Sequence, residues 1–377
     1  MNMRFGIIGV GYFGKHYVRL LQKMEGVELT GIATRLITEI PELSETIKVP
    51  RGKPRGIVGT RFARTSRGKA ARYSTFVASS LGRNESKLSF RSSLDAIKKY
   101  ESAHALLRDP GIDCVIIATP PSSHGELAIT ALEEGKHVLI EKPMAVSVAE
   151  AQAIADAANK SGRICMIGHQ YCYNDYIRVL KKEIEKKTIG DIKYIFAEHL
   201  YAGPVRLDIG CLWETATHEL AMIDYLFGHV SATKIIGQVV DITGSGREDA
   251  ASVVISFDNG VVLTITTTWF APRKVRRMIM GGTKGMAVFD EQEDHPLVFF
   301  NHPYPKGESP ELHTSHFFEI TEKETYIPSI DAHEPLRNEL THFMECIREQ
   351  KTPITGVDHG LRVTKLLDEI TVAITSL

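Results

Sequence analysis

The sequence predicts an α/β protein: a doubly wound parallel sheet, followed by an α+β domain with a large, mainly antiparallel open sheet. A glycine-rich turn follows the first apolar strand. Short apolar strands then alternate with amphipathic helices as far as about residue 169, which indicates a parallel sheet. Beyond about residue 190 the segments are long and alternate between apolar and polar residues, as in an antiparallel sheet. We expect a first domain over residues 1–145 and a second over 146–377.

The first elements form the unit that binds a dinucleotide in Rossmann folds. They are a strand over residues 3–9, a helix over about 12–24 and a strand over 27–34. Between strand and helix lies a GxGxxG turn, in which Gly9 permits the tight turn, Gly11 lets a pyrophosphate approach and Gly14 lets the helix pack closely. Free N–H groups at the helix N-terminus then face the phosphates, so Gly9, Gly11, Tyr12, Phe13 and Gly14 are predicted cofactor residues. A tight turn without a ligand is the alternative.

The same alternation continues through the rest of the first sheet. The predicted elements are a helix over 92–109, a strand over 113–119, a helix over 122–135, a strand over 137–141, a further helix and a strand over 163–169. Ser123 with Glu126, and Ser147 with Glu150, have the spacing of capping boxes at helix starts.

The second domain is predicted from a different pattern of apolar and polar residues. Its alternating segments span 191–203, 231–243, 251–270, 276–282 and 285–290, and helices close the chain near 334–349 and 358–376. Asp258-Asn259-Gly260 is a hairpin signal within the third of these segments.

Composition excludes several classes of protein. Hydrophobic residues make up 43% and charged residues 24% of 377 residues, which is ordinary for a globular protein. A formal net charge of -1 argues against nucleic-acid binding by bulk charge, and no apolar run approaches the roughly 18 residues of a membrane span. The N-terminus reads as a strand rather than a signal peptide. The scattered cysteines lack CxxC spacing, so we expect reduced thiols and a cytoplasmic protein.

A basic insertion interrupts the first domain over about residues 36–90. Within it, residues 48–72 contain nine Lys or Arg and no acid. A solvated surface segment is one interpretation. A basic arm that closes over cofactor phosphates or a nucleotide-bearing substrate is another, and nucleic-acid binding is a more distant third.

The end of the second strand bears on the choice of cofactor. An acid there binds the ribose hydroxyls of NAD, whereas an arginine suits the 2′-phosphate of NADP. This chain has Thr34 and Arg35 and no acid, so the prediction is NAD(P), with NADP slightly favoured. Alternatively, Arg35 simply begins the basic insertion.

Polar residues gather where the later strands end, which is where ligands of open α/β sheets bind. Lys142 follows Glu141 at one such end and could steer or accept a hydroxyl proton; a surface lysine is the alternative. The other predicted site residues at strand ends are Thr119, Pro120 and His124 for the cofactor, with Glu141 and Lys142, and His169 and Tyr173 for the substrate.

A helix predicted over 210–228 carries a second cluster. Glu214 and His218 are four residues apart and so share one face. A histidine is a natural general base, and Glu214 could orient its ring. A packed helical histidine is the alternative, and a zinc site lacks diagnostic spacing, so we expect no metal.

Several tracts together resemble the Gfo/Idh/MocA family of sugar oxidoreductases. They are FGIIGVGYFG, DCVIIATPPSSHGELAITALEEGKHVLIEKP and GCLWETATHELAMIDYLFG, and the likeness covers almost the whole chain except about 36–90. The resemblance implies active-site roles for Lys142 and His218, and a large sheet that mediates homodimers or homotetramers. Glu214 stands where the family often has Asp or Asn, and Cys172-Tyr173 replaces an Arg-aromatic pair.

The resemblance implies an NAD(P)-dependent sugar dehydrogenase, with a nucleotide-linked amino sugar as the expected substrate. The hydroxyl proton would go to His218, with Lys142 assisting or substituting as base, and Glu214 would complete the catalytic set. The alternatives are an inositol or free-sugar dehydrogenase, a carbonyl reductase acting on small compounds or a diphenol derivative, and a non-catalytic dinucleotide-binding regulator.

Overall fold

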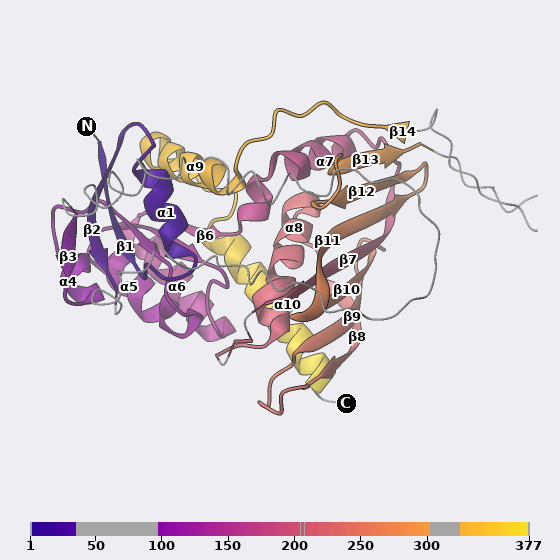
Figure 1. The fold of residues 1–377 in the computed structure, drawn as a ribbon, viewed down its shortest axis with the longest axis horizontal. Coiled ribbons are helices and arrows are strands. Elements are labelled where there is room, and N and C mark those ends of the chain that lie inside the picture. The colour runs from indigo at the N-terminus through magenta and orange to yellow at the C-terminus, as the bar shows by residue number, and fades with distance from the viewer. Residues whose placement is uncertain (1, 35–96, 204, 207, 302–324, 376–377) are drawn as a thin grey trace, which may run out of the picture.

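The computed structural model describes residues 2–34, 97–203, 205–206, 208–301 and 325–375. Within these residues the chain forms a six-stranded sheet and an eight-stranded sheet, with helices packed against both (Figure 1). Arg35 and the basic insertion at 36–90 lie outside the described residues, so the expectations that rest on them stay predictions.

The six-stranded sheet is parallel throughout and has the order β3-β2-β1-β4-β5-β6. Its strands are β1 (Met3–Ile8), β2 (Val27–Ala33), β3 (Lys98–Tyr100), β4 (Cys114–Ile117), β5 (His137–Glu141) and β6 (Cys165–Gly168). The helices along this part of the chain are α1 (Gly14–Leu21), α4 (Ala103–Leu107), α5 (His124–Glu133) and α6 (Val148–Ser161). The strand order reverses between β1 and β4, as in a doubly wound Rossmann sheet, which confirms that prediction.

Both faces of this sheet are buried because side chains alternate along each strand. In β4, Cys114 and Ile116 face the core that contains α1, whereas Val115 and Ile117 face the core that contains α4, α5 and α6. All four side chains have 0% exposure. The continuous apolar run of β4 therefore has the pattern expected of a strand covered on both sides.

The eight-stranded sheet has the order β14-β13-β12-β11-β7-β10-β9-β8. Its strands are β7 (Ile192–Ala202), β8 (Ala232–Val240), β9 (Ala250–Phe257), β10 (Val262–Thr268), β11 (Phe270–Gly282), β12 (Met286–Asp290), β13 (Leu297–Phe300) and β14 (Thr325–Tyr326). Its pairings are antiparallel except that of β10 with β7, so the mainly antiparallel sheet is confirmed. The hairpin signal also holds, since Gly260 has φ +82° and its N–H donates to Phe257 O at 3.0 Å.

The helices of the second half connect the two sheets. They are α7 (Asp175–Glu185), α8 (Thr217–Phe227), α9 (Pro335–Glu349) and α10 (Val357–Thr375), with short helical turns η2 (Pro121–Ser123), η3 (Gln170–Tyr173) and the π-helical η4 (Leu212–Ala216). Helix α10 contacts α6 and β6 on one side and α8 and β8 on the other. In α9, Phe343 packs edge-on against Phe5 of β1, with ring centroids 6.2 Å apart.

A single buried cluster therefore runs from the first sheet into the second. The division at residue 145 stays a prediction. The inclusion of β6 in the first sheet, and the packing of α9 against β1, favour a first unit that takes in both of these elements.

Two local predictions are wrong. Residues 98–107 form β3 and the five-residue helix α4 rather than the middle of one helix, because Tyr100 is buried at a sheet edge and Ser102 caps a new helix through Ala105 N–H. Ser123 does not cap α5; its hydroxyl lies 2.7 Å from Thr119 Oγ1 and 2.8 Å from Pro120 O instead. The cap at Ser147 is confirmed, since its hydroxyl accepts the N–H of Glu150 at 3.2 Å.

Candidate active site

The carboxyl ends of β1, β4, β5 and β6 bring four predicted site residues to one edge of the first sheet. Gly9 follows β1, Thr119 follows β4, Lys142 follows β5 and His169 follows β6. In the parallel register, Ile8 pairs with Ile117 and Glu141 with Gly168, so these ends are level. The sheet thus gathers residues that are up to 160 positions apart in the sequence.

The glycine turn has the geometry that a bound pyrophosphate requires. Gly9 has φ +89°, and a Cβ there would lie 2.6 Å from Ala118 O. A Cβ on Gly14 would lie 2.0 Å from Gly9 O, so only glycine lets α1 pack this closely. A Cβ on Gly11 would meet nothing within 4 Å, which leaves open space beside the start of α1. The turn therefore fits a dinucleotide phosphate.

The neighbouring cofactor candidates differ in their exposure. Tyr12 is 84% exposed and can contact a ligand, whereas Phe13 packs against Tyr17 with ring centroids 5.7 Å apart. Thr34 is half-buried after β2, and Pro120 is exposed beyond Thr119. His124 is fully buried, and its two ring nitrogens lie 2.9 Å from Pro143 O and from Thr119 O. His124 therefore braces the loops around the edge rather than facing a cofactor.

Lys142 bridges the two halves of the chain. Its Nζ donates to the backbone oxygen of Glu214 at 2.7 Å and to Glu214 Oε1 at 2.9 Å. Glu214 Oε2 accepts from Arg206 at 3.0 Å, and Arg206 is paired in turn with Asp208. The Lys142 side chain keeps 14% exposure. The lysine is thus fixed at the strand end while remaining open to a small molecule.

His218 is held by aromatic rings and not by Glu214. Its ring meets Tyr171 edge-on, with centroids 5.0 Å apart, and stacks on His199 at 5.5 Å with an angle of 13°. His199 is fixed by Glu219, whose Oε1 lies 2.9 Å from its Nδ1. Glu214 shares a helical segment with His218, but its oxygens bind Lys142 and Arg206. The expectation that Glu214 orients the His218 ring is therefore wrong.

His218 has the electrostatic setting of a neutral base. The side chain is 5% exposed, and its Nδ1 has no hydrogen-bond partner among the described residues. Burial lowers the pKa of His218 well below the usual 6.5, and the charge of Lys142 lowers it further. The ring is therefore uncharged near neutral pH, as a proton acceptor must be.

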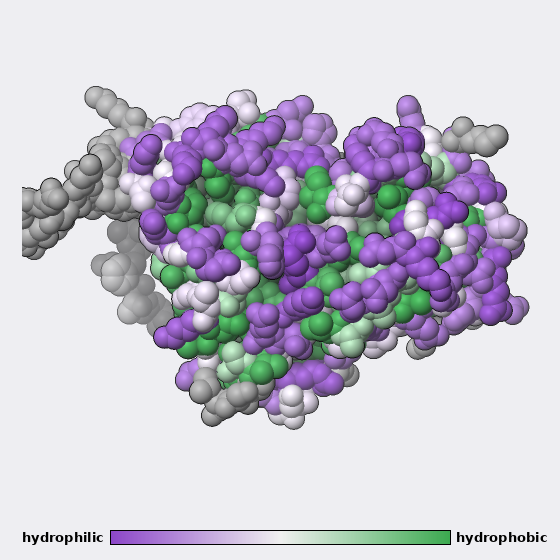
Figure 2. Space-filling view, turned by 180° about the vertical axis from the view of Figure 1, so that it is seen from behind, coloured by the Kyte–Doolittle hydropathy of each residue, from purple (hydrophilic) through white to green (hydrophobic). Residues whose placement is uncertain are grey.

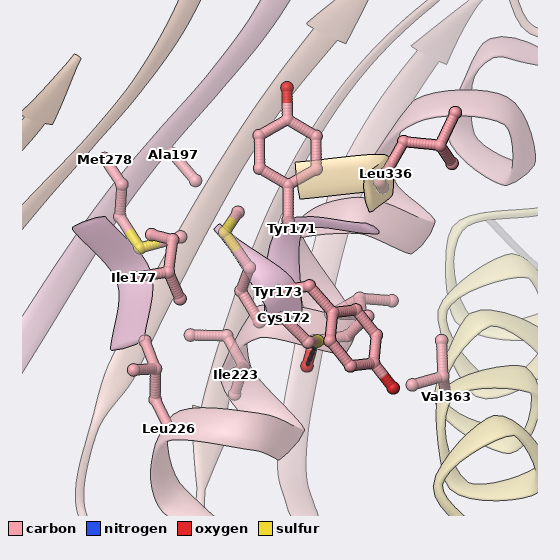
Figure 3. Close-up of a cluster of buried hydrophobic side chains, with 14 of the residues drawn as sticks. Tyr171, Cys172, Tyr173, Ile177, Ala197, Ile223, Leu226, Met278, Leu336 and Val363 are labelled. Carbon is pink, nitrogen blue, oxygen red and sulfur yellow. Dashed lines mark hydrogen bonds between the residues drawn. The ribbon is translucent and has the colours of Figure 1, made fainter. Parts of the chain in front are cut away.

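The two remaining predicted substrate residues, His169 and Tyr173, are both buried. His169 is 1% exposed, and its Nδ1 lies 2.9 Å from His359 Nε2. Tyr173 has 0% exposure, and its hydroxyl binds Thr355 at 2.8 Å. Figure 3 shows Tyr173 within a hydrophobic cluster near Val363, with Tyr171 pointing away from it. Tyr171 and not Tyr173 contacts His218.

Glu141 is also buried away from the edge. Its Oε1 accepts the hydroxyl of Tyr17 at 2.6 Å, and its Oε2 accepts the backbone N–H of Lys142 at 3.2 Å. It supports the turn that carries Lys142.

Sequence reasoning missed Arg206, Tyr171 and His199. His199 had a usable signal: it alternates with Ile195 and Ala197, so a polar ring falls on the buried face of a strand. Tyr171 and Arg206 lie outside long periodic elements and gave no comparable signal. Among the described residues, no group of three or more His, Cys, Asp or Glu is arranged to hold a metal ion.

The surface and helix lengths add a further observation. On the face shown in Figure 2, hydrophobic patches interrupt a largely hydrophilic surface. Within the part of the chain that the structure describes, no helix combines the length and apolar character needed to cross a membrane.

A glycine turn that fits a dinucleotide, beside a lysine and a neutral histidine, defines the class of NAD(P)-binding oxidoreductases. Comparison with known families agrees. The oxidoreductase family with an NAD-binding Rossmann fold, GFO_IDH_MocA, matches residues 55–169, and the GFO/IDH/MocA C-terminal domain matches residues 177–288. The chain belongs to the Gfo/Idh/MocA family.

Individual relatives are distant. Scyllo-inositol 2-dehydrogenase (NAD(+)) from Bacillus subtilis is 28% identical over 277 residues, which are 70% of this chain and 76% of that protein. Myo-inositol 2-dehydrogenase from Thermotoga maritima is 25% identical over 254 residues, 63% of this chain and 75% of that protein. The solved UDP-N-acetylglucosamine 3-dehydrogenase of Acidithiobacillus ferrooxidans shares the fold, with TM-score 0.71 at 20% identity over 100% of this chain and 99% of its own.

Proposed function

We propose that the protein oxidises a secondary hydroxyl on the ring of a sugar or inositol, with NAD(P) as the hydride acceptor. The observation that carries the proposal is the buried, uncharged His218 close to the Lys142–Glu214 pair, at the sheet edge that also holds the glycine turn. The names of the inositol dehydrogenases among the relatives support an alcohol of this kind.

The side chains supply a route for the hydroxyl proton. An ammonium group has three hydrogens, and Lys142 uses two bonds on Glu214, so one donor is free for the substrate hydroxyl oxygen. His218 then accepts the hydroxyl proton, and Arg206 keeps Glu214 in place during the transfer. NAD(P), when bound, would supply the acceptor for the hydride from the carbon that carries this hydroxyl. General-base assistance of this type contributes roughly 10²–10⁴-fold to rate.

The narrower choice of substrate is also a proposal. A nucleotide-linked amino sugar is favoured by the resemblance in sequence, and its phosphates would suit the basic residues of 48–72, which lie outside the described residues. The inositol dehydrogenases favour the alternative of a free ring. A preference for NADP, a homodimeric or homotetrameric state and a cytoplasmic location remain predictions.

A substrate panel tests the function. Purified protein is assayed with scyllo-inositol, myo-inositol, glucose and UDP-N-acetylglucosamine, each with NAD⁺ and NADP⁺. We expect formation of reduced cofactor with at least one alcohol. Lys142→Met and His218→Asn should each lower kcat by roughly 10²–10⁴-fold, while fluorescence titration shows that the reduced cofactor still binds.

A matched control comes from the same strand. His137, at the opposite end of β5 from Lys142, is 8% exposed and accepts Ile164 N–H through Nδ1 at 3.0 Å. His137→Asn keeps an acceptor there and should retain wild-type kcat. Full activity in Lys142→Met or His218→Asn would remove that residue from the mechanism. Cofactor binding without turnover of any alcohol would favour the regulatory alternative.

A further inference from the structure

A chain of hydrogen bonds runs from the substrate edge of the first sheet into the helices behind it. His169 Nδ1 lies 2.9 Å from His359 Nε2, and His359 Nδ1 lies 2.6 Å from Asp224 Oδ2. Arg362 donates to both oxygens of Asp224, at 2.6 and 2.8 Å. The residues come from the end of β6, from α10 and from α8, and both histidines are at most 4% exposed.

The direction of each bond follows from the charge of Asp224. Burial acts to raise its pKa, but hydrogen bonds from Arg362 and His359 lower the pKa of Asp224 to about 2. The group is therefore a carboxylate, which only accepts hydrogen bonds. A His359 ring with a single hydrogen donates it to Asp224 through Nδ1, which leaves its Nε2 as an acceptor. In this tautomer His169 donates through Nδ1, so its Nε2 carries a lone pair and no proton.

That bare nitrogen has no partner. His169 Nε2 is buried without a hydrogen bond among the described residues. His169 ends β6 next to the strand that ends in Lys142, and the charge of Lys142 acts on both the His169 and His218 rings. An unsatisfied buried acceptor is costly, and a catalytic role is one of the physical reasons for which native structures keep such a group.

We propose that His169 is a second proton acceptor at the candidate active site, and that His359 and Asp224 are positioning residues that orient it and share its charge. The inference rests on the proposed function, because alcohol oxidation is what releases the proton. The proton that His218 takes from the alcohol passes on to His169 Nε2 as the Nδ1–H proton of the His169 ring moves to His359 Nε2. His359 becomes an imidazolium whose Nδ1–H stays on the Asp224 carboxylate, so one positive charge faces one negative charge.

The Asp224 end of this His169–His359–Asp224 relay meets a cavity lined by both polar and apolar side chains. The cavity has a volume of about 130 Å³, and its lining includes Asp224, His229, Ser231, Arg362, Lys365 and Glu369. A water takes up roughly 30 Å³ in the liquid, so the space holds a small group of waters. Because Asp224 lines the cavity, the Nδ1–H proton of the His359 imidazolium passes to the Asp224 carboxylate and from there to water.

The central test is the protonation state of the rings in Asp224→Asn. In full-length protein with ¹⁵N-labelled histidine, nitrogen shifts show which ring nitrogen carries hydrogen. The wild type should show a bare Nε2 on His169. An asparagine amide that donates to His359 Nδ1 reverses both bonds, so Asp224→Asn should place hydrogen on His169 Nε2. Hydrogen at that nitrogen in the wild type, or no change in the variant, would overturn the relay.

Kinetics distinguish a relay from a purely structural contact. With whichever alcohol of the panel the wild type oxidises fastest, Asp224→Asn should lower kcat by about 10²-fold, the lower end for acid–base assistance. The acid limb of the pH profile should move to lower pH, because the imidazolium loses its carboxylate. The charged groups that face the relay are Lys142 at His169, and Asp224 and Arg362 at His359.

A second variant guards against misfolding. His359→Gly leaves a ring-sized space, and added imidazole should restore kcat in proportion to its concentration, whereas His137→Asn should need no rescue. If the wild type is active and Asp224→Asn has the same kcat and the same pH profile, the relay is refuted while the proposed function stands. If the wild type oxidises none of the four alcohols, the proposed function is refuted. If its histidine rings then still show the expected protonation states, the hydrogen-bond chain is supported.

Discussion

The carboxyl pair Glu141 and Glu339 predicts a stability that depends on pH. The hydroxyl of Tyr17 lies 2.6 Å from Glu141 Oε1 and 3.1 Å from Glu339 Oε1, but it has one hydrogen and donates to one carboxyl at a time. Glu339 has 0% exposure, and its Oε2 lacks a partner among the described residues. Burial raises the pKa of Glu141 from 4.5 to about 7, and burial and the charge of Glu141 hold the pKa of Glu339 well above its usual value.

The sign follows from the number of protons bound. Between the unfolded pKa of 4.5 and the folded pKa of about 7, the native state binds more protons at Glu141 than the unfolded state does. The free energy of unfolding therefore falls as the pH rises through this window. At 1.36 kcal/mol per pKa unit, the shift of Glu141 corresponds to roughly 3 kcal/mol. Glu339→Gln removes a second buried carboxyl whose pKa is also raised, so its stability advantage over the wild type should grow as the pH rises from 5 to 8.

Urea unfolding of wild type and Glu339→Gln across pH 5 to 8 measures the difference. At pH 5 the two proteins should agree within about 1 kcal/mol, because a protonated Glu and a Gln are both neutral. Buried histidines also respond to pH, but they are common to both proteins and cancel in the difference. Glu133→Gln, at an exposed position of α5, is the control and should show no trend. A difference between Glu339→Gln and wild type that stays constant with pH would refute the reasoning.

Further predictions concern the cofactor turn and the outer face of the large sheet. Gly11→Ala should leave the melting temperature unchanged, because its Cβ meets nothing within 4 Å, yet weaken NAD(P)H binding at least about tenfold, or ~1.4 kcal/mol, by obstructing the pyrophosphate. Unchanged affinity in a fluorescence titration would mean that the phosphates do not pass this glycine. Phe196 of β7 is 49% exposed, so Phe196→Asp should lower the molecular mass found by sedimentation if the expected oligomer forms through this sheet. Gln152→Asp on α6 is the control, and a monomeric wild type would contradict the expectation.

Local patterns predicted most of the fold and part of the candidate site. Gly9, Gly11 and Gly14 were predictable because each answers a backbone requirement that a short segment imposes. Lys142 was predictable because the end of an apolar strand fixes where the next residue lies. The alternation of β7, β9 and β10 likewise identified an antiparallel sheet before any contact was known.

Partners across long separations were not predictable. Glu214 was expected to serve His218, four residues away, but it binds Lys142, which is 72 positions away. The choice depends on how η4 docks on β5, and no local pattern encodes that docking. The bond between His169 and His359 spans 190 positions for the same reason. The edge strand β3 was predicted as part of a helix because three residues are too few to show the alternation of a strand.

The packing of α9 against β1 has a consequence for the order of synthesis. A ribosome makes Phe5 well before Phe343, so one face of the first sheet emerges without its cover. Apolar surface left open in this way invites association with other chains until the cover arrives. The first sheet is therefore completed only after α9 has been synthesised, and a chain that ends before α9 should be retained by chaperones.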